Sequence, residues 1–145
     1  MILFRYATAV LFALLFAGCV ADGPQVAADV PPKTIYVKKF ECEQPAIGEA
    51  ARNKFIQLIS DKTNGKVIMK EKGAELVIEG AVTMNKMYTI GISSRAVSNN
   101  RFVALGSYSE GYNPRRKRFY STDNIARLAA NDLISNLWEK RILGR

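Results

Sequence analysis

The sequence of 145 residues contains no histidine and only two cysteines. Histidine is the commonest general acid or base and the commonest metal ligand in proteins, so its absence argues against most hydrolase and metal-site mechanisms. The sequence also lacks a glycine-rich phosphate loop and any metal-ligand spacing. We therefore expect a protein that is not an enzyme and that has no catalytic residues, no metal and no cofactor.

Acidic residues are in the minority. The chain has 21 Lys and Arg against 13 Asp and Glu, which gives a formal net charge of +8. A balance this basic favours contact with an anionic partner, such as lipid headgroups, acidic envelope polymers or an acidic protein. The length and the 48% hydrophobic content leave room for one domain and no second one.

The longest apolar run is too short to span a membrane. It covers residues 7–17, whereas a spanning helix needs roughly 18 apolar residues or more. Arg5 precedes the run and the small residues Ala17 and Gly18 end it, which is typical of a signal peptide over residues 1–18. An ordinary secreted protein is the alternative to the lipoprotein described next.

Cys19 follows the apolar run after Gly18, and the residues before it resemble the lipobox of bacterial lipoproteins. Phe16 departs from the usual Leu of that motif. The resemblance implies cleavage before Cys19 and a covalent N-acyl and S-diacylglycerol lipid on this residue, which would hold the protein on a membrane. The residue after Cys19 is Val20 and not Asp. By resemblance to enterobacterial lipoproteins this indicates the periplasmic face of the outer membrane, with the inner membrane as the alternative.

Residues 19–32 are rich in Ala, Asp, Gly and Pro and show no periodicity. This composition predicts a flexible tether. At ~3.3 to 3.6 Å per extended residue it reaches about 45 Å, so the domain stays close to its membrane.

Residues 33–145 are expected to form a single periplasmic α+β domain. The clearest alternation of apolar and polar residues covers 74–85, and helical spacing follows Pro45, with Glu49 expected to complement the helix start and Gly65 to stop the helix. We predict strands over residues 34–40, 66–70, 74–85, 88–98 and 102–108, and helices over 45–63 and about 121–143. The order β-α-β-β-β-β-α predicts a two-layer sandwich, with a mostly antiparallel sheet and both helices on one face.

The strand over residues 74–83 resembles the Ala-Asp-Tyr-apolar-apolar-x-Gly-x-apolar-Thr strand of a group of envelope lipoproteins, and Arg95-Ala96-Val97 resembles a second segment of that group. The group comprises the curli-secretion lipoprotein family, the lipoprotein activators of penicillin-binding proteins and the amino-terminal domain of the Tol-Pal translocation protein. The resemblance covers most of residues 33–143 and implies an accessory role in an envelope machine. Membrane-spanning hairpins like those of the curli channel are not to be found here, because every candidate strand already belongs to the domain core.

The densest charge cluster follows a turn at residues 110–114. Arginine and tyrosine are favoured at protein interfaces, and the same residues could hold a phosphate or an anionic lipid head. Our candidate partner-binding residues are Tyr112, Arg115, Arg116, Lys117, Arg118 and Tyr120. The alternative is a solvated loop whose aromatic side chains pack back on the domain. Nucleic acid is a poor candidate, because an exported protein would rarely meet it.

Cys42 lies between two glutamates, whose negative charge argues against a reactive thiolate. We expect a buried, unreactive thiol, with intermolecular pairing as the alternative. Ser93-Ser94-Arg95 lacks a neighbouring base, and nothing gathers the acids into a cleft, so they are expected to be solvated. Those acids are Glu41, Glu43, Glu75 and Glu79.

Three functions remain open at this point. The favoured one is a non-catalytic accessory or assembly lipoprotein that binds a protein partner in an envelope complex. The second is a self-associating ring or secretion-channel component. The third, an envelope hydrolase, is opposed by the missing histidine.

Overall fold

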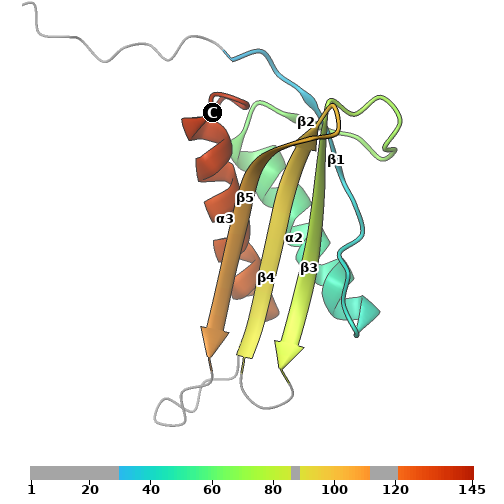
Figure 1. Cartoon of the computed structure of the whole chain (residues 1–145), viewed down its shortest axis with the longest axis vertical. Helices are drawn as coiled ribbons and strands as arrows, with labels where there is room; N and C mark the ends of the chain where they lie inside the picture. Colours follow the sequence, from blue (N-terminus) through green and yellow to red (C-terminus); the bar gives the residue numbers. More distant parts are fainter. Residues whose placement is uncertain (1–29, 86–88, 112–120) are drawn as a thin grey trace, which may run out of the picture.

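The computed structural model describes residues 30–85, 89–111 and 121–145, which form a five-stranded sheet with two helices packed on one of its faces (Figure 1). The elements are β1 (Thr34–Val37), α2 (Pro45–Lys62), β2 (Lys66–Val67), β3 (Leu76–Asn85), β4 (Thr89–Ser98), β5 (Arg101–Gly111) and α3 (Thr122–Glu139). The predicted α+β class and the predicted order β-α-β-β-β-β-α are confirmed.

The strand order in the sheet is β2-β1-β3-β4-β5. Strands β3, β4 and β5 form an antiparallel meander, and β1 runs parallel to both β2 and β3. The β4–β5 connection contains Asn99 and Asn100 with positive φ angles of 49° and 58°. Asparagine tolerates this left-handed conformation, which the tight hairpin between β4 and β5 requires.

The core lies between the sheet and the helices. Alternate residues of the strands point into it, among them Ile35, Ile78 and Ile92, all fully or almost fully buried. From α2, Phe55 packs edge-on against Phe40, with ring centroids 4.8 Å apart. One side of α3 is buried as well, through Ile125, Ala126, Ala129, Ala130, Leu133, Ile134 and Leu137.

Two glycines let the layers approach closely. A Cβ atom on Gly80 would lie 2.5 Å from the Phe40 ring, and one on Gly106 would lie 2.4 Å from the backbone nitrogen of Leu133. Phe40 therefore rests directly on β3, and the backbone of α3 rests directly on β5. Any larger side chain at either position would force the two layers apart.

The last helix is shorter than predicted. It ends at Glu139 rather than near Leu143, because Arg141 adopts a positive φ of 53° and reverses the chain. The amides of Ile142 and Leu143 then donate to the carbonyl of Leu137, and Leu143 folds back into the core. Its apolar side chain therefore belongs to a closing turn and not to a helical stripe.

The ends of α2 also differ from the prediction. Thr63 ends the helix by donating its hydroxyl to the carbonyl of Ile59, and Gly65, which has no positive φ, is placed tightly against Ile35 instead of stopping the helix. Glu49 lies beyond the first turn and pairs with Arg52 at 3.7 Å.

The strands over residues 34–40 and 66–70 are shorter than predicted, and the one over 102–108 is longer. Phe40 leaves the β1 ladder to enter the core, although Glu41 rejoins β3 through an isolated bridge to Ala81. Neither of the helices in the described ranges is long and apolar enough to cross a membrane.

Candidate functional site

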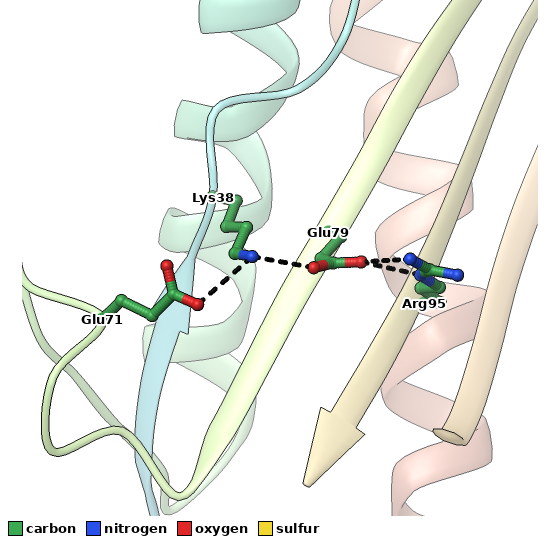
Figure 2. A network of polar contacts seen from close by, with 4 residues as sticks. All are labelled: Lys38, Glu71, Glu79 and Arg95. Carbon is green, nitrogen blue, oxygen red and sulfur yellow. Dashed lines mark hydrogen bonds and ion pairs between the residues drawn. The ribbon is translucent and has the colours of Figure 1, made fainter. Parts of the chain in front are cut away.

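The side of the sheet opposite the helices carries a row of ion pairs (Figure 2). We call this side the open face. Lys38 Nζ lies 2.9 Å from Glu79 Oε1 and 3.2 Å from Glu71 Oε1. Arg95 Nε and Nη2 approach Glu79 Oε2 at 2.7 and 2.6 Å. Since Glu79 and Arg95 pair across β3 and β4, the strand register itself brings the two charges together.

The network favours the charged forms of Glu79 and Lys38. Hydrogen bonds from Lys38 and then Arg95 lower the pKa of the Glu79 carboxyl below its ordinary value. Hydrogen bonds to Glu79 and then Glu71 raise the pKa of Lys38. The pKa of Glu75 is also lowered, mainly by the backbone N–H of Thr34. These contacts therefore favour the ionised forms of Glu75 and Glu79.

A shallow depression of about 230 Å³ lies beside this network. Both small residues and longer side chains line it. The lining residues are Glu41, Glu79, Gly80, Ala81, Ser93, Ser94, Arg95 and Leu105. The rim therefore offers an arginine and two carboxylates for polar contacts and one leucine for an apolar contact.

Leu105 lies in the middle of β5 and is 57% exposed. It pairs with Arg95 across β4 and β5, so its side chain continues the row of the ion pairs. One row away, Val77 of β3 pairs with Val97 of β4, and both are half-buried. The open face thus combines exposed apolar surface with paired charges of both signs.

The outer edge of the sheet is partly covered by α3. Three side chains, four residues apart along the helix, bind backbone groups of β5: Asp132 accepts from the amide of Ser107 (2.9 Å), Asn136 donates to the carbonyl of Leu105 (2.7 Å) and Lys140 donates to that of Val103 (2.7 Å). These hydrogen bonds satisfy backbone N–H and C=O groups of β5 that would otherwise be free to pair with another strand. The first half of β5 is thus closed to strand addition, and the open face is the more accessible surface.

The predicted lipidation residue Cys19 lies outside the described residues, and so do the candidate partner-binding residues Tyr112, Arg115, Arg116, Lys117, Arg118 and Tyr120. These predictions therefore stay predictions. Figure 1 does show that β5 ends and α3 begins at the end of the sheet opposite the start of β1.

Cys42 is a free cysteine that packs against the core but is only partly buried, whereas a buried thiol was expected; its low reactivity stays a prediction. Ser94 points into the covered layer and donates to the carbonyl of Gly106 (2.9 Å). Among residues 30–85, 89–111 and 121–145, no three Cys, Asp or Glu side chains group in a way that could hold a metal. Sequence reasoning missed the depression, although the outward positions of Glu79 and Arg95 in their alternating strands were a signal for the ion pair.

No protein-family model and no curated protein matches the sequence. Solved structures do match the fold. A dodecamer of a PelC variant from Paraburkholderia phytofirmans has a TM-score of 0.53 and 17% identity, over 77% of this chain and 92% of that chain. Lipoprotein GNA1162 from Neisseria meningitidis has a TM-score of 0.50 and 15% identity, over 72% of this chain and 98% of that chain. The chain therefore shares its fold with these bacterial proteins, and the resemblance to the curli, penicillin-binding-protein-activator and Tol-Pal group stays a prediction.

Proposed function

We propose that the protein is a lipoprotein of the bacterial envelope, anchored through lipids on Cys19, that acts as a non-catalytic accessory factor and binds a protein partner through the open face. Three observations support the anchor: the apolar leader, the small residues before Cys19, and a fold shared with lipoprotein GNA1162. The same proposal puts the domain on the periplasmic side, with the outer membrane favoured by Val20.

The open face carries the partner-binding part of the proposal. Helices cover one side of the sheet, whereas the other combines the exposed Leu105 with the depression and the charged network. An arginine held in place by a carboxylate loses little freedom when it meets a partner, so binding costs less conformational entropy there. The fixed charges of both signs would set the orientation of that partner.

The anchor is tested by metabolic labelling with palmitate, followed by mass spectrometry of the amino-terminal peptide. We expect Cys19→Ser to abolish labelling and Cys42→Ser, the matched control, to leave it unchanged. A mature protein whose Cys19 sulfur is unmodified would contradict the anchor.

The open face is tested by introducing a photocrosslinking residue at Leu105 and, as a control, at the exposed Arg127 of α3. We expect a discrete crosslinked product only from position 105. Ser93→Trp, which fills the depression, and Arg95→Glu should each abolish it. A product that survives both substitutions, or that forms equally from Arg127, would contradict the proposed surface.

A homo-oligomeric ring or secretion-channel component is the second candidate, because the PelC of similar fold is a dodecamer. In that case the partner on the open face is another copy of the chain. Light scattering of detergent-purified protein should then give a mass several times that of the protomer, and Leu105→Asp should reduce it. A monomer at all concentrations excludes this candidate. A screen against hydrolase substrates tests the remaining enzyme alternative, for which we expect no activity.

A further inference from the structure

Four segments meet at the end of the domain from which the tether leaves. We call this region the tether end and define it as residues 30–34, 63–75, 98–102 and 139–145. Hydrogen bonds join the segments: Asn64 Nδ2 donates to the carbonyl of Val30 (2.6 Å), and the Asn64 side chain accepts from the amide of Gly144 (2.9 Å). Ser98 Oγ likewise donates to the carbonyl of Glu75 (2.9 Å). The exit point of the tether is therefore a fixed part of the fold.

Charge is distributed unevenly between this end and the rest of the domain. The tether end holds eight basic residues, Lys33, Lys66, Lys70, Lys72, Arg101, Lys140, Arg141 and Arg145, against three acidic ones, Glu71, Glu75 and Glu139. The remaining described residues hold seven basic and eight acidic side chains. All of the net positive charge of the described residues is thus concentrated where the tether emerges.

Exposed apolar side chains occur at the same end. Met69 is 80% exposed and lies between Lys66 and Lys70, and Phe102 is 55% exposed beside Arg101. Apolar side chains among lysines and arginines suit the boundary between headgroups and acyl chains, because the apolar groups enter it while the cations stay among the phosphates.

We propose that the tether end is a membrane-docking surface that binds the anionic phospholipid headgroups of the bilayer holding the lipid anchor. This inference rests on the proposed function, because the anchor brings the surface to the bilayer. Ten residues separate Cys19 from Val30, and they span on the order of 35 Å when extended. At that distance the bilayer is present at high effective concentration, so contacts that are weak singly suffice to hold the domain against it.

Docking in this way would set the orientation of the whole domain. The strands would stand upright on the membrane, because β1 and β3 both begin at the tether end (Figure 1). The open face would then be exposed sideways, parallel to the membrane normal, where a neighbouring copy or a partner in the same membrane could reach it.

The test uses the lipidated protein in vesicles of phosphatidylcholine, with or without phosphatidylglycerol. A fluorophore is attached at Met69→Cys or, as the control at the other end of the sheet, at Ser109→Cys, both in a Cys42→Ser background. Quenching by a spin-labelled lipid reports contact with the bilayer. We expect quenching at position 69 only when phosphatidylglycerol is present, and none at position 109 with either lipid.

Two charge variants sharpen the experiment. Lys66→Gln with Lys70→Gln should lower the equilibrium constant for docking, as reported by quenching, about fivefold for each cation removed. Lys39→Gln with Arg127→Gln removes the same charge outside the tether end and should leave this constant unchanged. Raised salt should also weaken it, because exposed charges are screened. Equal effects of the two pairs would overturn the proposal.

Flotation separates this proposal from the anchor. In one outcome, the protein floats with neutral vesicles while quenching at position 69 does not depend on phosphatidylglycerol. This result would support the anchor and overturn the docking surface. A protein that floats only with phosphatidylglycerol vesicles overturns the anchor and supports the surface. A protein that floats with neither, binding an acidic protein or polymer instead, overturns both.

Discussion

The two faces of the sheet are built from the same strands but differ in almost every physical property. In β3, Ile78 is fully buried under the helices, whereas the next residue, Glu79, lies in an ion-pair network at the surface. In β5, Gly106 supports the backbone of α3, whereas its neighbour Leu105 is more than half exposed. Neighbouring residues of one strand therefore differ in role. Side chains on the covered face stabilise the fold, and those on the open face stay exposed to solvent.

The largest expected effect is on the covered face. Phe55→Ala removes a fully buried ring that packs against Phe40. Because a cavity adds to the lost burial, we expect the free energy of unfolding to fall by about 3–5 kcal/mol. Chemical denaturation followed by circular dichroism measures this. A loss below about 1 kcal/mol would mean that this contact does not hold α2 to the rest of the core.

The same substitution, glycine to alanine, can be made on each face of the sheet, and the two losses of stability can be compared. In Gly106→Ala the new methyl group would lie 2.4 Å from Leu133, so the helix must shift. We expect a loss of about 1–3 kcal/mol. Gly91→Ala places its methyl on the open face, no closer than 3.2 Å to any neighbour, and should cost clearly less in the same denaturation experiment. Equal losses would contradict the difference between the faces.

The ion pairs of the open face should contribute less than the core. Exposed pairs typically contribute below about 1 kcal/mol, so Glu79→Gln should cost no more than that. The folded-state pKa of Glu79 is depressed, so its contribution is present above the ordinary value of 4.5 and is lost as the pH falls through the folded value. The pKa of Lys38 is raised, so its contribution is present below 10.5 and is lost as the pH rises through the folded value. The stability difference between wild type and Glu79→Gln should accordingly be constant near neutrality and shrink in acid.

The smallest effect is expected at Leu105. Because this side chain is exposed, Leu105→Ser should change the free energy of unfolding by less than about 0.5 kcal/mol. Leu133→Ala, at a fully buried leucine of α3, should cost about 2–5 kcal/mol. A large loss at Leu105 would mean that it acts within the fold and is not available to a partner.

Much of the fold follows from local pattern. The alternation in residues 74–85, the pair Asn99-Asn100 and the spacing after Pro45 each predict the element that forms. The predicted bounds of the first strand fail where a long-range contact decides the outcome. Phe40 leaves this strand and packs its ring against Gly80, where no side chain is in the way. Leu143 likewise continues the apolar pattern of α3 but reaches the core through a chain reversal at Arg141.

The candidate site was less accessible to sequence reasoning. The basic segment was the most conspicuous motif, whereas the open face depends on strand register, which aligns Glu79, Arg95 and Leu105 from three separate strands. Nor does any single stretch of sequence reveal the charge of the tether end, because four distant segments contribute to it.

The position of Val30 has a mechanical consequence. The chain enters the domain at the start of β1, which lies between β2 and β3 with both neighbours parallel to it. A pull on the tether away from the domain acts along the axis of this strand and loads its hydrogen bonds together in shear. Unzipping them one after another would need a force across the strand. The proposed lipid anchor would therefore pull on the domain in the direction in which a sheet resists extraction best.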